Sequence, residues 1–363
     1  MNQPLRFHWS LSQAGNKFRR ASDMEGMSGL IDTAPQVALC KKAEENGIES
    51  MLMAIGFTRP DPLLLTVHLA QQTKKIKFMV AVRSGIISPS FFVQQINTAA
   101  ALTNGRILIN VVGGHSPVEL GYYGDFTAHD ERYERSGEFL EICNKFWNED
   151  SGFDYKGKFY QLEKATINTP FIAPDRNRPE IYVGGNSRKA ANLAAQHADC
   201  LWRFPDTMQS LQPVIDSVLH RGKEVGLLVS LITRPSQEQA VEEAYGMLKE
   251  MNATAIEANE KFRKKSDSEG FKAVLEMAAK AKTDWKDSCL WTGAVPYLGA
   301  PSIALVGSYE NIAKQLMAYK KIGISQFLFM GWPDIEEVEH FGKGVLPLLR
   351  KMENHKQKEN VLN

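Results

Sequence analysis

The sequence contains few cysteines, and none of them stands in a metal-binding pattern. Only four occur in 363 residues, and no two form a Cys-x-x-Cys pair: they are Cys40, Cys143, Cys200 and Cys289. Structural zinc sites and disulfide-stapled small domains both depend on closely spaced cysteines. The spacing therefore argues against a metal site and a disulfide framework, and it is typical of a protein from a reducing compartment.

Net charge and long apolar runs are also lacking. The 43 Lys and Arg residues nearly balance the 42 Asp and Glu residues, so the formal net charge is +1. This balance gives no overall electrostatic footprint for nucleic acid, although it leaves a local basic patch open. No apolar stretch reaches the roughly 20 residues of a membrane span, and the N-terminal segment MNQPLRFHWSLSQ does not have the pattern of a signal peptide. We therefore expect a cytoplasmic protein with no nucleic-acid or membrane partner.

The sequence does contain a regular alternation of short β-rich runs and longer helical patterns. Eight strands are predicted at residues 6–11, 48–55, 77–82, 106–112, 180–183, 199–202, 227–233 and 326–330. Helical patterns occupy residues 34–46, 62–72, 90–102, 130–147, 188–197, 207–224 and 335–351. Length alone is compatible with two domains. Strand–helix units in this order instead favour one α/β domain over residues 1–363, a parallel (β/α)8 TIM barrel with insertions.

Three further segments depart from this alternation. Residues 153–161 predict a small hairpin that turns at Lys156-Gly157. Residues 236–300 are too long for a simple crossover, and we expect a helical insertion before the last strand that serves as an active-site lid. The polar tail at residues 354–363 is expected to fray.

The active site of such a barrel lies at the carboxyl ends of its strands. The residues there are mainly glycines, amides, hydroxyls, arginines and aromatics: Ser12, Gln13, 56–59, Arg83, Ser84, Asn110, 113–115, 184–187, Trp202, Arg203, Arg234, Gly331 and Trp332. This set has few acids, no paired carboxylates and no metal-ligand spacing, which disfavours hydrolysis by an acid–base pair or a metal. Such a wall suits a planar, anionic organic ligand.

One short motif is a candidate for an anion site at a strand-to-helix turn. In Val183-Gly184-Gly185-Asn186-Ser187 the two glycines let the backbone approach a ligand, and the start of the helix supplies unpaired N–H groups. The alternative is an ordinary glycine turn followed by an Asn or Ser cap.

A second motif pairs two hydrogen-bonding side chains. His129 and Tyr133 are four residues apart, so a helix places both on one face, where imidazole and phenol can donate to phosphate oxygens. The alternative is that Asp130 caps the helix and Tyr133 begins its apolar stripe.

Several short motifs follow one another along nearly the whole chain: FMVAVRSGIISP (78–89), LTNGRILINVVGG (102–114), HDERYERSGEF (129–139), YVGGNSRKAA (182–191), IALVGSYENIAKQL (303–316), IGISQFLFMGWPDIEEV (322–338) and VLPLL (345–349). In this order they resemble the bacterial luciferase superfamily, and within it most closely the alkanesulfonate monooxygenases.

The resemblance implies a (β/α)8 barrel that uses reduced FMN (FMNH2) and O2 to oxygenate a small organic substrate. It also implies a separate NAD(P)H-dependent flavin reductase as partner, and a homodimer or homotetramer. Asn110 would meet the isoalloxazine ring, and Arg83 would face flavin or substrate. Carried over by position, the cofactor-binding residues are Arg83, Asn110, His129, Tyr133, Gly185, Asn186 and Ser187.

The substrate half of the sequence departs from the sulfonate enzymes. Arg59 stands in place of their cysteine after the second strand, Gln13 in place of a histidine, and Trp332 in place of a tyrosine. These three are our candidate catalytic positions.

Cations of the sulfonate enzymes are missing as well. Their Arg-x-His pair in the seventh strand corresponds to Leu228 and Ser230, and their lid arginine corresponds to Leu298. Arg59 and Arg203 are the residues that would supply relocated charge. Because a sulfonate needs converging cations, we expect a different or larger substrate, with a carbonyl or an acyl chain.

Three other functions remain open. The same barrel supports deazaflavin-dependent oxidoreductases, which transfer hydride without oxygen. Because several catalytic residues of the family are missing, the chain could also be a flavin-binding protein without catalytic activity. Finally, a barrel of this kind could bind some other phosphorylated metabolite.

Overall fold

The computed structural model describes residues 3–11, 33–57, 59–149, 151–249, 251, 253–331 and 334–362. Gln13 and Trp332, two of the predicted catalytic positions, lie outside these ranges. Among the described helices, none combines the length and apolar character that a membrane crossing requires.

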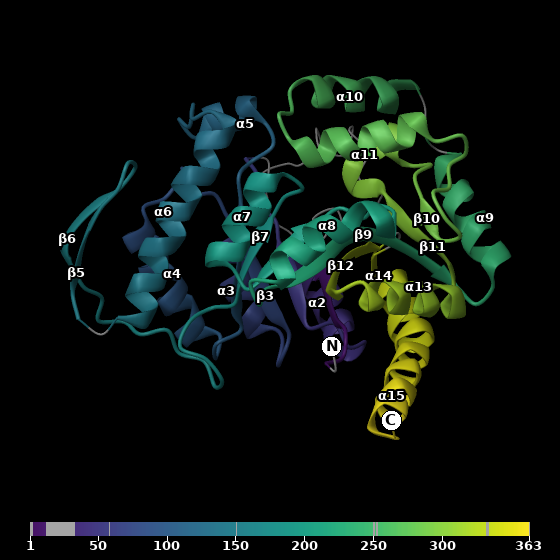
Figure 1. The fold of residues 1–363 in the computed structure, drawn as a ribbon, viewed down its shortest axis with the longest axis horizontal. Helices are drawn as coiled ribbons and strands as arrows, with labels where there is room; N and C mark the ends of the chain where they lie inside the picture. Colours follow the sequence, from purple (N-terminus) through teal and green to yellow (C-terminus); the bar gives the residue numbers. More distant parts are fainter. Residues whose placement is uncertain are drawn as a thin grey trace.

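Eight parallel strands close into a barrel, which confirms the predicted fold class (Figure 1). The strands are β1 (Arg6–Ser10), β2 (Ser50–Met53), β3 (Lys77–Val82), β4 (Ile107–Val112), β7 (Ile181–Gly184), β8 (Cys200–Arg203), β9 (Glu224–Arg234) and β12 (Ile324–Gly331). They pair in this order, and β12 pairs again with β1. The eight β-rich runs of the sequence therefore correspond to the eight strands of one barrel.

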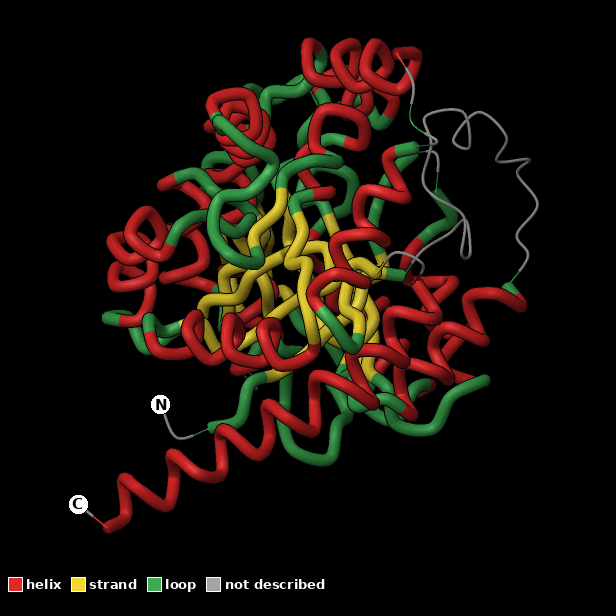
Figure 2. The backbone as a smooth tube through the Cα atoms, turned by 90° about the vertical axis from the view of Figure 1, so that its right-hand side faces the viewer, coloured by secondary structure: helices red, strands yellow, loops and turns green. Residues whose placement is uncertain are grey.

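Helices surround the barrel, with the strands at the centre of the molecule (Figure 2). They are α2 (Ala34–Glu45), α3 (Pro62–Gln71), α4 (Pro89–Leu102), α5 (Pro117–Tyr122), α6 (His129–Asn148), α7 (Arg188–His197), α8 (Met208–Leu219), α13 (Tyr309–Lys321), α14 (Asp334–His340) and α15 (Leu346–Leu362). A π-helical turn, Phe341–Val345, joins the last two. Helix α15 continues through most of the segment in which the composition predicts a frayed tail.

One predicted helix boundary is wrong. The pattern at 207–224 predicts a single helix, but α8 ends at Leu219 and β9 begins at Glu224. Gly222 has a φ of +69°, a conformation that glycine adopts without strain and that ends the helix before the strand.

The segment after β9 forms the predicted helical insertion and also an extra strand. The insertion contains α9 (Gln237–Leu248), α10 (Ala253–Lys264), α11 (Glu269–Lys280), β10 (Leu290–Trp291), α12 (Val295–Leu298) and a 3-10 turn, Ala300–Ser302. Strand β11 (Ala304–Ser308) then pairs with β9 before the chain enters α13. The hairpin at β5 (Phe153–Lys156) and β6 (Gln161–Ala165) is confirmed.

Strand β11 was not predicted, because the barrel already has eight strands without it. Ser230 and Leu231 of β9 pair with β12 on one edge and with β11 on the other. Strand β8 pairs with that second edge only as far as Leu227. The length of β9 thus leaves an unpaired edge beyond β8, and β11 covers it.

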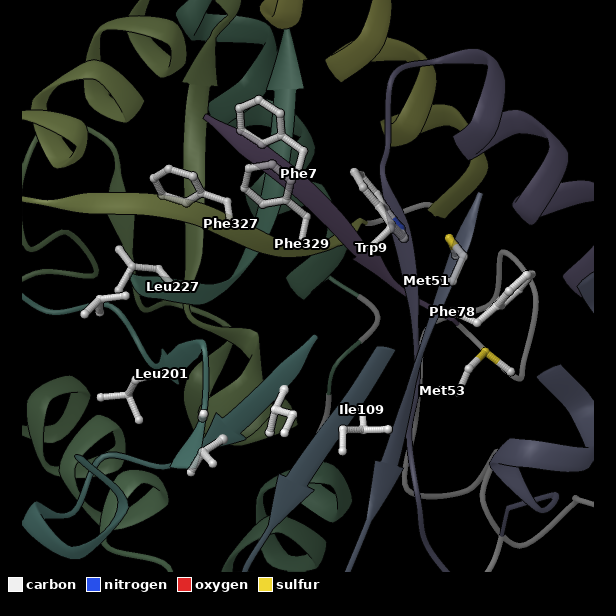
Figure 3. Packing of buried hydrophobic residues seen from close by; sticks show 14 of the residues in the cluster. Phe7, Trp9, Met51, Met53, Phe78, Ile109, Leu201, Leu227, Phe327 and Phe329 are labelled. Carbon is white, nitrogen blue, oxygen red and sulfur yellow. The ribbon is translucent and has the colours of Figure 1, made fainter. Parts of the chain in front are cut away.

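Side chains alternate between the inside of the barrel and the layer beneath the helices. The interior cluster consists of strand residues only: Met79, Leu108, Tyr182, Cys200, Trp202 and Leu328, with Leu52 and Leu228 packed against it. The outer layer combines the other strand face with the inner faces of the helices, and Figure 3 shows Phe7, Phe327 and Phe329 of β1 and β12 gathered there. The Phe7 and Phe329 rings stack with their centroids 5.8 Å apart.

A fully paired polar network fills the amino end of the barrel. Arg6 donates hydrogen bonds to Glu49 and Glu180 at 2.6 to 2.8 Å. His8 lies deeper, between Ser50 at 2.7 Å and Gln326 at 2.9 Å. Because these charged and polar groups satisfy one another's hydrogen bonds, this end of the barrel contributes to its stability.

We expect Glu180→Gln to remove part of the acid sensitivity of the fold. Burial acts to raise the pKa of Glu180, but the hydrogen bonds from Arg6 outweigh it and lower the pKa from 4.5 to about 2. A carboxyl with a lowered folded-state pKa stabilises the fold above its unfolded pKa, and that contribution is lost as the pH falls toward 2. Glu180→Gln should cost about 2–3 kcal/mol at neutral pH, measured by urea unfolding.

The same variant should lose less stability than the wild type between about pH 5 and pH 3. Glu163→Gln, on the exposed face of β6, is the matched control and should behave as the wild type. Equal pH slopes for Glu180→Gln and the wild type would contradict this account.

Candidate functional site

A cavity of about 270 Å³ opens at the carboxyl ends of β2, β3, β4, β7, β8 and β9. We call it the barrel-mouth cavity. Its wall includes all but one of the predicted cofactor-binding residues: Arg83, Asn110, Tyr133, Gly185, Asn186 and Ser187. His129 is the exception. The cavity therefore opens on the face that the strand-end rule predicts, and the structure brings together residues that lie more than a hundred positions apart.

A larger hollow, of about 690 Å³, lies at the opposite end of the barrel. Its wall contains Arg6, Glu49 and Glu180, whose charged groups are already paired with one another. Because these ion pairs satisfy their own hydrogen bonds, this hollow is a weaker candidate for a ligand site than the barrel-mouth cavity.

The turn between β7 and α7 forms one corner of the cavity. The Ser187 hydroxyl caps α7 by accepting a hydrogen bond from the Ala190 N–H at 3.1 Å, and it also bonds to the Tyr133 side chain. A Cβ atom at Gly185 would lie 2.6 Å from the Ala190 Cβ and 3.1 Å from the Tyr133 hydroxyl. Only glycine fits here, so the backbone of the turn is open to the cavity.

His129 lies at the rim of this corner. Its ring is edge-on to Tyr133, with centroids 5.3 Å apart, which confirms that the two side chains share one helix face. The imidazole bonds to Asp130 at 3.1 Å, and Asp130 pairs with Lys189 of α7 at 2.9 Å. The first turns of α6 and α7 are thereby held together, and both helix starts face the same corner.

Two buried polar side chains point into the cavity from the barrel interior. Asn110 is 5% exposed, and its Oδ1 atom has no partner in the described part of the chain. Arg83 is 3% exposed; Nη2 donates to Glu119 at 2.9 Å, while Nε and Nη1 are buried without a partner among the described residues. Unpaired buried polar atoms are costly, and a bound ligand is one way to satisfy them.

Asn186, in the cavity wall, also ties the turn to the neighbouring strand. Its side-chain oxygen accepts a hydrogen bond from the Phe204 N–H at 3.0 Å, and its carbonyl accepts one from Arg203 at 3.2 Å. Both bonds tie the β7–α7 turn to the end of β8. The Asn186 side chain thus positions the turn, and the residue is part of the cavity wall.

Of the three predicted catalytic positions, only Arg59 lies within the described residues, so their arrangement stays a prediction. Arg59 is not part of the cavity wall, and its side chain would lie 3.3 Å from a Cβ atom at Gly56. Leu228, which takes the place of the family arginine, does line the cavity, whereas Leu298 packs in a separate hydrophobic cluster with Trp291.

The insertion, which the sequence predicts as an active-site lid, supplies part of the cavity wall. Ser268, Glu269, Gly270 and Phe271, around the start of α11, line the cavity. Arg132 of α6 holds this segment: it donates to the Asp267 carboxylate at 2.6 Å and to the Gly113 carbonyl at 2.8 Å. No motif marks these residues, since they enter the wall only through the tertiary fold.

Burial also determines the charge state of groups at the cavity. It raises the pKa of Tyr133 and lowers the pKa of His115, so both are neutral near pH 7. The His115 ring packs edge-on against Phe271, 5.2 Å between centroids. Among the described residues no group of three or more His, Cys, Asp and Glu side chains could hold a metal ion.

Solved structures share this fold at low sequence identity. Long-chain alkane monooxygenase superposes with a TM-score of 0.74 at 18% identity, over 97% of this chain and 92% of that chain. Riboflavin lyase, solved with modified FMN and riboflavin, gives 0.72 at 17% identity, over 96% and 92%. An F420-dependent secondary alcohol dehydrogenase gives 0.65 at 17% identity, over 96% and 99%.

A family comparison is more specific than these structural similarities. The model of the luciferase-like monooxygenases matches residues 7–326, which include every strand of the barrel except the first residue of β1 and the greater part of β12. The match contains the Gly185 turn, the Tyr133 helix and the Asn110 strand. From this agreement of sequence and barrel we conclude that the chain belongs to the luciferase-like monooxygenase family.

Proposed function

We propose that this protein is an FMN-dependent monooxygenase that oxygenates a small organic substrate with reduced FMN and O2. One observation carries the proposal. A single cavity contains both the β7–α7 turn, which is suited to an anion, and the buried unpaired polar atoms of Asn110 and Arg83. Riboflavin lyase, a structural relative, was solved with modified FMN. When bound, reduced FMN would supply the electrons that activate oxygen, and the protein would supply position and exclusion of water.

The residues of the cavity fit the two ends of FMN. The phosphate would meet the Gly185–Ser187 backbone, the Tyr133 hydroxyl and the starts of α6 and α7, where N–H groups lack helical partners. The ring system would lie toward the barrel axis, where Asn110 Oδ1 and Arg83 Nε and Nη1 need hydrogen-bond partners. His129, which lies at the rim and not in the cavity wall, would bind the phosphate from that side.

The substrate side of the cavity is apolar. Ile55, Leu228, Leu328 and Phe271 contribute to it, and the positions of two family cations are leucines. This composition supports a substrate with a carbonyl or an acyl chain rather than a simple alkanesulfonate. Arg59, Gln13 and Trp332 remain predicted catalytic positions for this half of the reaction.

The start of α11 would close the cavity over the bound ligands. Arg132 anchors this segment through Asp267, so exchange of flavin with a separate NAD(P)H-dependent reductase would require the contact to open. A homodimer or homotetramer is the assembly that the family suggests.

Oxygen consumption by the purified protein tests the proposed function. With a flavin reductase, FMN and NAD(P)H, a panel of carbonyl and acyl compounds should contain one that stimulates O2 uptake and gains one atom from labelled oxygen. Short alkanesulfonates should not. Hydride transfer to deazaflavin F420 without O2 would instead support the function of the dehydrogenase relative, and flavin binding without any product would support a non-catalytic protein.

Asn110→Leu should weaken flavin binding and stabilise the flavin-free protein. The substitution removes a partner of the ring and, in the free protein, an unpaired buried oxygen, so we expect roughly 10-fold weaker binding of both FMN and riboflavin and about 1 kcal/mol of added stability. Thermal unfolding with and without flavin measures both effects.

Asn97→Leu is the control for this variant, because both ends of the Asn97 side-chain amide are bonded, to Trp147 and to the Thr169 carbonyl. It should destabilise the protein and leave flavin affinity intact. A loss of stability in Asn110→Leu would show that its amide is satisfied without a ligand.

Asp267→Asn should speed flavin exchange. Loss of the carboxylate weakens the ion pair with Arg132 that holds the start of α11, so association and dissociation rates should both rise several-fold while Kd changes little. Stopped-flow flavin fluorescence measures this. Glu276→Gln, on the exposed face of α11, should have no effect, and unchanged rates in Asp267→Asn would remove the role of α11 as a lid.

A further inference from the structure

Arg203, at the end of β8, is a cavity residue that forms no ion pair with the described carboxylates. It lies in the wall of the barrel-mouth cavity, and its Nη1 donates to the Asn186 carbonyl at 3.2 Å. Its Nε is buried and has no partner in the described part of the chain, and the charge of Asp206 acts on the guanidinium without a hydrogen bond. A half-buried guanidinium without an ion-pair partner is costly, and an anionic ligand relieves that cost.

The alternation of side chains along β8 indicates which part of the cavity Arg203 serves. Cys200 and Trp202 belong to the interior cluster of the barrel, while Leu201 belongs to the layer beneath the helices. Because alternate side chains of a strand point to the same face, the Arg203 side chain points to the same face as that of Leu201. Its guanidinium is therefore on the helix side, beside the turn that starts α7, and not on the barrel axis with Asn110 and Arg83.

Three hydrogen bonds fix Arg203 against that turn. The Gly185 N–H donates to the Trp202 carbonyl at 3.0 Å, the Phe204 N–H donates to Asn186 Oδ1, and Arg203 donates to the Asn186 carbonyl. These bonds leave the guanidinium next to Gly185 and Ser187. Two acids belong to these surroundings: Glu269 lines the cavity and is exposed at the start of α11, and Asp206, three residues after Arg203, acts on it through its charge.

We propose that Arg203 binds the phosphate of FMN directly and makes the site selective for FMN over unphosphorylated flavin. The inference rests on the proposed function, and it adds a residue that lies outside every motif on which the family resemblance was based. A guanidinium donates paired hydrogen bonds to phosphate oxygens, which suits it to this role better than a lone amide or hydroxyl.

An anionic group of the substrate is the other possible ligand of Arg203. The geometry favours phosphate, because the apolar residues expected around the substrate, such as Leu228 and Leu328, belong to the interior face or pack against it. Arg203 lies on the opposite face of its strand.

Binding of oxidised FMN and riboflavin to purified variants, followed by quenching of flavin fluorescence, tests this assignment. In Arg203→Gln we expect FMN to bind roughly 10- to 100-fold more weakly, since a charged hydrogen bond is lost, with riboflavin affinity unchanged within about twofold. Arg203→Lys keeps the charge and should show an intermediate loss. It also serves as the second variant should Arg203→Gln fail to fold.

Arg221→Gln is the matched control for charge. Arg221 is exposed between α8 and β9, at the amino end of the barrel, so its replacement changes the net charge equally and should alter FMN affinity by no more than about twofold. Repeating the titrations with chemically reduced flavins under anaerobic conditions should give the same ratios.

The possible failures are distinguishable. If Arg203→Gln weakens FMN and riboflavin equally, or neither, the phosphate assignment is overturned while the proposed function stands. A variant that binds FMN normally but shows a raised KM for substrate would place Arg203 on the substrate instead. If the wild type binds no FMN at all, the proposed function fails, and the inference fails with it.

Discussion

Buried polar groups need hydrogen-bond partners, and the two ends of this barrel differ in how that need is met. At the amino end, Arg6, Glu49 and Glu180 satisfy one another, and the network needs no ligand. At the carboxyl end, Asn110 and Arg83 each bury atoms that have no partner within the described residues. The barrel is otherwise held together by side chains packed on both faces of its strands. The contrast between its two ends therefore locates the site more firmly than the sizes of their hollows do.

Much of the fold could be predicted because the signals are local. Alternating strands and helices follow from apolar periodicity and turn residues, and a parallel barrel is the architecture that buries eight such units together. The segment containing β11 and α13 was missed because its place depends on how far β9 extends beyond β8. Strand pairing of that kind is a property of the closed barrel, and no short stretch of sequence carries it.

The candidate site likewise contains residues that local motifs predict and residues that only the tertiary fold brings in. Gly185, Ser187 and Tyr133 stand in motifs whose spacing already implies an anion corner, and the structure places them together. Asn186 also lies in the cavity wall, and its side chain accepts a hydrogen bond from the end of β8, a contact that the motif does not indicate. Phe271 enters the wall from an insertion without motifs. Contacts between distant segments depend on tertiary packing, and sequence spacing does not reveal them.

We infer that flavin supplies hydrogen-bond partners to the unpaired polar groups at the carboxyl end of the barrel. The hydrogen bonds at the amino end should not change. The most direct measurement is a ¹⁵N–¹H spectrum of the arginine Nε–H groups, with Arg83 and Arg6 assigned by lysine substitution. On addition of FMN, the Arg83 signal should shift while the Arg6 signal stays in place. An unmoved Arg83 signal under saturating FMN, or an equal shift at Arg6, would contradict the account.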